Sequence, residues 1–169
     1  MDGTRHKALF QELLDTQHTA LRRLCHGYER DEASRHDLEQ EIWLNLWRAL
    51  PRYRGDASLR TWMYRVAHNV ASRHVARAIR TPKPSFDERR SEGQVASTPS
   101  LDEVVAQADA RARLRLCINQ LRSLDRQIIL LFLEDIPQAE IGEITGLSQA
   151  NVSTRVHRIK GELTKMMSE

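Results

Sequence analysis

The chain has 169 residues, of which 26 are lysine or arginine and 23 are acidic, so its formal net charge is +3. An isoelectric point near 9.1 allows a polyanionic partner without requiring one. No segment reaches the roughly 20 apolar residues of a membrane span, and no region alternates with a period of two. We therefore expect an all-α, cytoplasmic protein without a membrane-inserted segment.

The two cysteines, Cys25 and Cys117, lie far apart and neither belongs to a metal-ligand spacing such as C-x-x-C. Cys25 is followed by His26, but adjacent residues of a helix point to different sides. We expect both thiols to be reduced and half-buried. The sequence predicts neither a metal site nor a cofactor.

The first helical region is expected over residues 8–28, where leucines recur at helical spacings, with Thr4 as a candidate N-cap. Residues 29–41 then carry six acids, which is more than the start of a helix requires. The sequence DLEQEIWLNLWRAL, residues 37–50, predicts a further helix that ends before Pro51.

The helix over residues 37–50 carries more apolar surface than a small core needs, because Trp43 and Leu44 widen its apolar arc. Two interpretations follow with equal weight. The acid-edged apolar surface is a docking face for a protein partner, or the tryptophans fill the core. The apolar side of this helix consists of Leu38, Ile42, Leu46, Trp47 and Leu50.

The charge reverses between residues 48 and 80, which contain eight arginines and a single acid, Asp56. Aromatic residues are interleaved with these arginines. This combination is typical of a single-strand site, where cations contact phosphates and rings stack on unpaired bases. Ser58 is expected to cap a helix that runs to about Ala78. One ridge of that helix carries Arg65, Asn69, Arg73 and Arg77. The alternative is a helix whose arginines are only solvated.

Residues 81–100 are rich in proline and serine and contain few apolar groups, so they predict a linker. Fully extended, this segment would reach roughly 65–70 Å, enough to separate two lobes on DNA. We therefore expect one small domain over residues 1–80 and a second over 101–169. The second should be a bundle of about four helices, with Ser123 capping the apolar helix before Pro137.

Residues 138–157, QAEIGEITGLSQANVSTRVH, have the pattern of a helix-turn-helix. Gly142 would let a second helix approach closely, and Gly146 would end the first helix in a left-handed conformation. Ser148 is a suitable N-cap for the second helix. The exposed face of that helix has residue types that bond base edges and phosphates in the major groove. The alternative is an ordinary helical hairpin whose polar face is only solvated.

Three stretches, in this order, resemble a bacterial sigma factor of the extracytoplasmic-function group, within the sigma-70 family. They are DLEQEIWLNLWRAL, YRGDASLRTWMYRVAHNVASRH and LRSLDRQIILLFLEDIPQAEIGEITGLSQANVSTRVHRIKGEL. The resemblance covers nearly all of the chain outside the linker. It implies a non-enzymatic subunit that binds core RNA polymerase, directs it to promoters and helps to melt the minus-ten element. It also implies an anti-sigma factor as a partner.

The resemblance assigns residues to three surfaces. The polymerase-binding set is Asp37, Leu38, Glu41, Ile42, Asn45 and Leu46. The minus-ten set, in which Asn69 stands where the family contacts a flipped base, is Tyr53, Arg60, Trp62, Tyr64, Arg65, Asn69, Arg73 and Arg77. The minus-thirty-five set is Gln149, Asn151, Ser153, Thr154, Arg155, His157, Arg158 and Lys160.

The chain departs from the family pattern at two places. An Asp-Ala-Glu-Asp run is common before the polymerase-binding helix, and this chain has Ser34-Arg35-His36-Asp37 instead. Losing acids there should weaken attraction to a basic polymerase surface, so we consider a supply of negative charge by nearby phosphorylation. Ser153 stands where a basic residue is common, which predicts an unusual base preference.

Two other classes of protein are considered. A dimeric helix-turn-helix repressor, or a response-regulator output domain, would use the C-terminal lobe in the same way but would not need an aromatic, arginine-rich segment. A nucleic-acid hydrolase would need a carboxylate cluster, phosphate-cradling glycines or a set of nucleophile and base. The sequence contains no such pattern.

Overall fold

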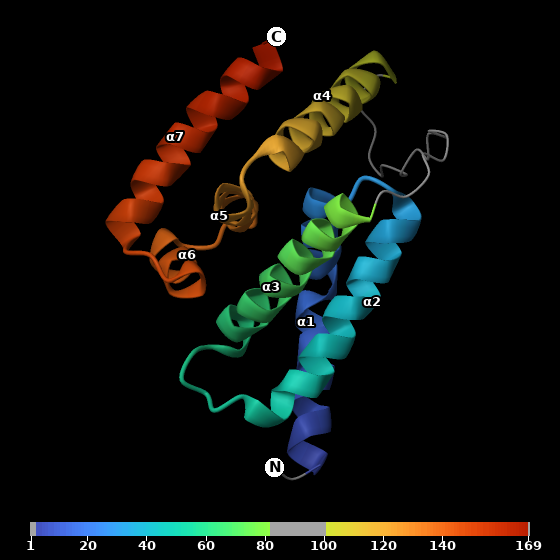
Figure 1. Ribbon diagram of the computed structural model, residues 1–169, viewed down its shortest axis with the longest axis vertical. Helices are drawn as coiled ribbons and strands as arrows, with labels where there is room; N and C mark the ends of the chain where they lie inside the picture. Colours follow the sequence, from blue (N-terminus) through green and yellow to red (C-terminus); the bar gives the residue numbers. More distant parts are fainter. Residues whose placement is uncertain (1–2, 82–100, 169) are drawn as a thin grey trace.

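The computed structural model describes residues 3–81 and 101–168, with side chains described from residue 105 onward in the second segment (Figure 1). These residues form helices and turns without strands, which confirms the all-α class. None of the described helices is long and apolar enough to cross a membrane. All of the predicted linker except Thr81 lies outside the described residues.

The first lobe contains α1 (Gly3–Tyr28), α2 (Glu32–Ala49), the short 3-10 helix η1 (Leu50–Arg52) and α3 (Leu59–Arg80). Helices α1, α2 and α3 pack against one another in all three pairs. Their shared core consists of buried residues that include Leu13, Leu21, Leu24, Leu38, Ile42, Leu46, Leu50, Met63 and Val70.

Two predicted helix starts in the first lobe are wrong. Helix α1 begins at Gly3, so Thr4 lies inside the helix and is not its N-cap. Helix α2 begins at Glu32 instead of Asp37, because the carboxylate of Asp31 accepts a hydrogen bond of 2.8 Å from the Ser34 N–H. The acidic segment before the predicted helix is therefore partly its first turn.

The start of α3 agrees with the prediction. The Thr61 N–H donates to Ser58 Oγ at 3.1 Å, so Ser58 is the N-cap, and the helix continues two residues beyond Ala78 to Arg80. Before it, Gly55 has a φ of +83°, which allows the chain to turn between η1 and α3.

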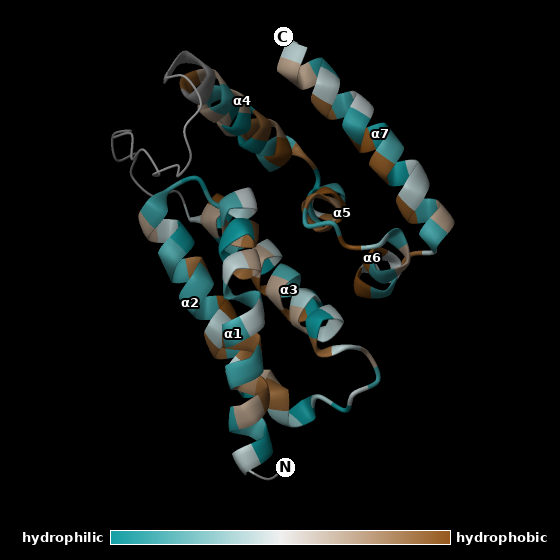
Figure 2. Cartoon of the chain, turned by 180° about the vertical axis from the view of Figure 1, so that it is seen from behind, coloured by the Kyte–Doolittle hydropathy of each residue, from teal (hydrophilic) through white to brown (hydrophobic). Residues whose placement is uncertain are grey.

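The second lobe contains α4 (Leu101–Gln120), α5 (Ser123–Leu133), α6 (Gln138–Thr145) and α7 (Gln149–Ser168), the four helices expected. Helix α5, the most uniformly hydrophobic helix in Figure 2, packs on α4, α6 and α7. Ser123 is the first residue of α5 and does not cap it; the preceding residue, Arg122, makes no capping bond.

The helix-turn-helix has the predicted turn. Gly146 ends α6 with a φ of +77°, and Ser148 Oγ accepts a hydrogen bond of 3.2 Å from the Asn151 N–H. A Cβ atom at Gly142 would lie 2.5 Å from the carbonyl oxygen of Leu147. The closest approach at Gly142 is therefore made by the turn, and the backbone nitrogen of Gln149, the first residue of α7, lies 3.7 Å from the same position.

The two lobes are packed against each other. Helix α1 contacts α4 and α5, and α3 contacts α6. Figure 1 shows α5 and α6 beside the first lobe, while α7 lies on the far side of the second lobe. Both cysteines are buried free thiols, more buried than expected, and burial raises the pKa of Cys25 to about 12.

Candidate nucleic-acid interface

A small pocket lies where the loop after η1 meets the start of α3. It has a volume of about 240 Å³ and is lined by Arg52, Tyr53, Arg54, Asp56, Ala57, Trp62 and Arg65. The rings of Tyr53 and Trp62 lie 5.3 Å apart at 50°. The Tyr53 hydroxyl donates a hydrogen bond of 2.7 Å to the carbonyl of Ala57, which fixes the loop over the pocket.

This pocket has the composition that an unpaired nucleotide requires. Two aromatic rings offer faces for a base, and three arginines offer charge for the flanking phosphates. Arg52 and Arg54 were absent from the predicted minus-ten set. The sequence signal for them was the alternation of arginine with Tyr53 directly before the glycine turn.

The rest of the predicted minus-ten set is spread along α3 and does not line this pocket. Asn69 and Arg73 are exposed, and the Arg73 Nε donates to the Asn69 carbonyl at 3.1 Å. Tyr64 is only 2% exposed and belongs to the core, which corrects its assignment to a DNA-facing surface. Arg77 forms an ion pair of 2.6 Å with Glu41 of α2.

His68, between Tyr64 and Asn69 in sequence order, is buried in the first lobe. Its Nδ1 lies 2.8 Å from the Tyr28 hydroxyl, and its Nε2 has no hydrogen-bond partner among the described residues. Burial lowers the pKa of His68 to about 3. The ring is therefore neutral at physiological pH and is a structural element beneath the exposed ridge of α3.

The apolar members of the predicted polymerase-binding set are core residues. Leu38, Ile42 and Leu46 are fully buried, so their side chains are not available to a partner. The reason is that α1 and α3 both pack on this side of α2. Phe10 of α1 also makes edge contacts with the ring of Trp43, so this tryptophan packs within the lobe.

The outer surface of α2 differs from the predicted one. Leu44 is 46% exposed and Trp47 is 37% exposed, although His6 stacks on the Trp47 ring at 3.9 Å. Asp37 is exposed, and Glu41 and Asn45 are half-buried. Burial of Glu41 opposes ionisation, but hydrogen bonds from Arg77 and His74 lower its pKa.

The predicted minus-thirty-five set lies on α7, and its members other than Arg155 are exposed: Gln149, Asn151, Ser153, Thr154, His157, Arg158 and Lys160. Arg155 and Arg158 are bound to Asp125 at the start of α5, at 3.0 and 2.8 Å. The Lys160 ammonium lies 4.2 Å from the centre of the Phe132 ring. Asp125 was not predicted; its only sequence signal is an acid in the first turn of an apolar helix.

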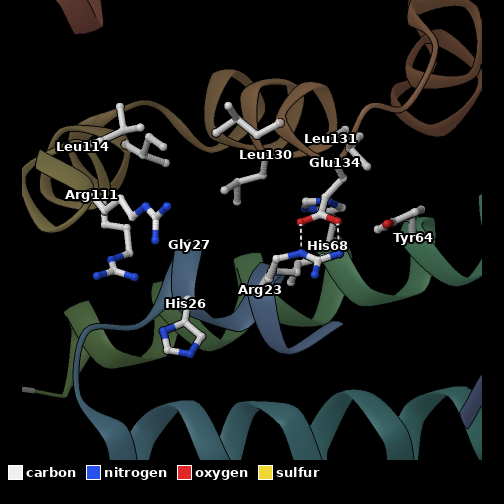
Figure 3. Close-up of a pocket in the computed structure, with 14 residues that line it drawn as sticks. Arg23, His26, Gly27, Tyr64, His68, Arg111, Leu114, Leu130, Leu131 and Glu134 are labelled. Atoms are coloured by element: carbon white, nitrogen blue, oxygen red, sulfur yellow. Dashed lines mark hydrogen bonds and ion pairs between the residues drawn. The ribbon is translucent and has the colours of Figure 1, made fainter. Parts of the chain in front are cut away.

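A larger cavity lies between the lobes (Figure 3). It has a volume of about 440 Å³ and is lined by residues of α1, α3, α4 and the end of α5. At one side of it, the Arg23 guanidinium and the Glu134 carboxylate form two hydrogen bonds of 2.6 and 2.7 Å. This pair raises the pKa of Arg23 and joins α1 to the end of α5. The described residues contain no cluster of side chains able to hold a metal ion.

Comparison with known protein families gives one match in each of the two lobes. Residues 13–81 match Sigma-70 region 2, and residues 111–163 match Sigma-70, region 4. The RNA polymerase sigma factor YlaC of Bacillus subtilis is 29% identical over 79% of this chain and 77% of its own length. The ECF RNA polymerase sigma-E factor of Escherichia coli is 28% identical over 73% and 69%.

Two solved structures have the same fold. One is CnrH in complex with the cytosolic domain of CnrY, with a TM-score of 0.67 and 21% identity over 94% of this chain and 87% of that chain. The other is the sigma factor RpoE of Bartonella quintana in complex with the anti-sigma factor NepR, with a TM-score of 0.69 and 16% identity over 94% and 96%. With regions 2 and 4 both present in order, the chain belongs to the sigma-70 family of bacterial RNA polymerase sigma factors, in its extracytoplasmic-function group.

Proposed function

We propose that this protein binds core RNA polymerase, directs it to specific promoters and helps to melt the minus-ten element. The observation that carries the proposal is the pocket beside Tyr53 and Trp62, where two rings and three arginines surround a space of about 240 Å³. Extruding a base from a duplex costs a few kcal/mol, and stacking returns roughly 1–3 kcal/mol per base. The pocket therefore holds one unpaired base of the melted strand.

The other two surfaces complete the activity. The exposed polar face of α7 reads the minus-thirty-five element in duplex form, with its side chains reaching base edges and phosphates. The outer surface of α2, around Asp37, Leu44 and Trp47, binds polymerase in place of the buried residues predicted first. This activity requires no catalytic group and belongs in the bacterial cytoplasm, where polymerase acts.

A dimeric repressor is the less favoured function, because it would not need a region 2 lobe with a base-sized aromatic pocket. An anti-sigma factor is a further proposed partner. Its support is that both structural neighbours are complexes, one of them a complex of a sigma factor with an anti-sigma factor.

The proposal is tested by run-off transcription with purified bacterial core polymerase on promoter fragments from the source genome. Wild-type protein should direct specific initiation, and Trp62→Leu should lower it about tenfold, because a stacking ring is lost. Trp62→Tyr is the matched control, since it restores a ring and should keep most of the activity. Polymerase binding, measured by co-migration, should be equal for all three proteins. Absence of polymerase binding and of initiation, together with tight binding to duplex DNA alone, would refute the proposal in favour of the repressor.

A further inference from the structure

The cavity of about 440 Å³ between the lobes has the size of a small-molecule site, for which roughly 300–1,000 Å³ is typical. Its apolar lining includes Leu114 and Ile118 of α4 and Leu130 of α5 (Figure 3). Leu130 also packs closely on Gly27 of α1, where a Cβ atom would lie 2.4 Å from the leucine Cδ2. The cavity therefore lies beside a tight contact of the two lobes and is not a general looseness between them.

One buried polar atom of the cavity lining has no hydrogen-bond partner among the described residues. The His68 ring lines the cavity and is 1% exposed; its Nδ1 lies 2.8 Å from the Tyr28 hydroxyl, and its Nε2 is unpaired. Buried polar atoms are nearly always hydrogen-bonded. Because the ring is neutral, Nε2 either donates or accepts one hydrogen bond, according to the tautomer. A ligand hydroxyl group fits both cases, since it can donate and accept.

The end of the cavity away from His68 is cationic. Figure 3 shows Arg111 of α4 there, and Arg115 follows one helical turn later in the same lining. Both side chains are exposed, and none of the described residues forms an ion pair with them. Burial lowers the pKa of the half-buried His26 nearby, and the charges of three arginines lower it further: Arg35, Arg115 and Arg22. An anionic group at this end would meet unpaired guanidinium groups.

Glu134 determines which end of the cavity an anion can occupy. Its carboxylate lies near His68 in Figure 3, and its two oxygens accept hydrogen bonds of 2.6 and 2.7 Å from the Arg23 guanidinium. The charge of Arg23 is thereby neutralised, and a second carboxylate beside Glu134 would be repelled. An anionic ligand is therefore oriented with its charge toward Arg111 and its uncharged end toward His68.

We propose that this cavity binds an amphipathic carboxylic acid with a hydroxyl group at its far end. At about 30 Å³ for each non-hydrogen atom, the share of one water in the liquid, the cavity holds roughly 15 such atoms, the size of a hydroxylated fatty acid of about ten carbons. The carboxylate binds Arg111 and Arg115, the chain lies along Leu114 and Leu130, and the hydroxyl group reaches Nε2 of His68. The two acyl chains of a phospholipid are too large for this space.

The site uses none of the residues of the three predicted surfaces, so the inference does not rest on the proposed function. Because the ligand contacts both lobes, its binding also stabilises the folded chain. Excess ligand should therefore raise the temperature of thermal unfolding, measured by circular dichroism.

The inference is tested by isothermal titration calorimetry of the full chain with ω-hydroxydecanoate. The dissociation constant should be on the order of 10–100 µM. Decanoate, which lacks the hydroxyl group, should bind about fivefold more weakly, because Nε2 of His68 stays unpaired. The methyl ester of ω-hydroxydecanoate, which lacks the charge, should bind about tenfold more weakly. Failure of ω-hydroxydecanoate to bind at about 1 mM would overturn the inference, and so would equal affinities for the acid and its ester.

Substitutions on α4 locate the site. Arg111→Gln/Arg115→Gln should weaken the binding of ω-hydroxydecanoate about tenfold and leave the binding of the methyl ester unchanged. The matched control is Arg113→Gln/Arg122→Gln, which removes the same charge from exposed positions outside the cavity lining and should bind the acid as the wild type does. Leu114→Trp fills the cavity and should weaken the acid and the ester alike. Equal affinities of the two double variants for the acid would contradict the proposed site.

Discussion

The two surfaces that we propose to face DNA hold their arginines in different ways. On α7, Arg155 and Arg158 are bound by Asp125 of the same lobe, and the neighbouring polar residues are exposed. On α3, Arg60 and Arg65 are bound by α6 of the other lobe. The first surface keeps its geometry whether or not the lobes separate, and the second changes when they do.

The difference is one of location. Asp125 and the two arginines that it binds belong to one lobe and move together, whereas Arg60 and Glu140 belong to different lobes. The Arg60 side chain nevertheless stays 46% exposed beside Glu140.

The largest expected effect comes from distorting the helix-turn-helix, which positions α7, without changing the first lobe. In Gly142→Ala, the new Cβ would lie 2.5 Å from the Leu147 backbone carbonyl, which cannot move without distorting the turn. Overpacking of this kind should cost about 3 kcal/mol. The second lobe should lose helical signal at lower temperature in circular dichroism. Tryptophan fluorescence, which reports the first lobe because all three tryptophans lie there, should change little.

The control for this substitution is Gly161→Ala. Gly161 lies inside α7 and has open space around its Cβ position, so alanine should stabilise the helix by about 0.5–1 kcal/mol. Both variants add one methyl group to the second lobe. Equal losses of stability in the two proteins would show that the packing at Gly142 is not tight.

A smaller effect distinguishes the arginines that are paired within one lobe from those that are paired across the two lobes. Asp125→Asn removes the charge that Arg155 and Arg158 share, and it should destabilise the second lobe by about 1–2 kcal/mol because the site is buried. The freed arginines can bind phosphates, so the slope of log affinity for duplex DNA against log salt should steepen by about 1–2. Asp125→Asn should leave the contacts between the lobes unchanged, because Asp125 binds arginines of its own lobe. An unchanged salt slope would contradict the prediction.

The sequence predicts the second lobe better than the surface of the first. The helix-turn-helix depends on local signals, a left-handed glycine at Gly146 and a serine cap at Ser148, and both stand as expected. The buried side of α2 depends on where α1 and α3 pack. The sequence pattern of α2 fits a docking face as well as a core until the positions of α1 and α3 are known. The structure buries the three residues concerned, Leu38, Ile42 and Leu46.

The contacts between the lobes were beyond prediction for a physical reason. Arg60 and Glu140 are separated by 80 residues of sequence, and neither belongs to a pattern that specifies the other. The extended length of the linker predicted lobes that can separate, and nothing in its composition indicated that they pack together. The base pocket lies between these cases. Tyr53, Trp62 and Arg65 were in the predicted set and Arg52 and Arg54 were not, and the geometry of the pocket depends on the Tyr53 hydrogen bond.

A further expected effect uses acid to weaken the first lobe. Burial holds the pKa of His68 at about 3, whereas an unfolded histidine has a pKa near 6.5. Between these values the unfolded chain binds a proton that the folded lobe excludes. As far as His68 is concerned, the free energy of unfolding of the first lobe is therefore highest above pH 6.5. It falls as the pH drops toward 3, by at most about 1.4 kcal/mol per pH unit from this group.

The measurement is urea unfolding followed by tryptophan fluorescence at pH 7, 6 and 5. Wild-type stability should fall across this range, and His68→Gln should fall less steeply, because glutamine cannot take up a proton. That variant should also be less stable at pH 7, since it disturbs the 2.8 Å contact with Tyr28, so the slope and not the absolute stability is the quantity to compare. Parallel slopes would assign the acid sensitivity to other groups. A shallower slope in His68→Gln would place the acid sensitivity in the core beneath α3, the helix on which we propose the minus-ten surface.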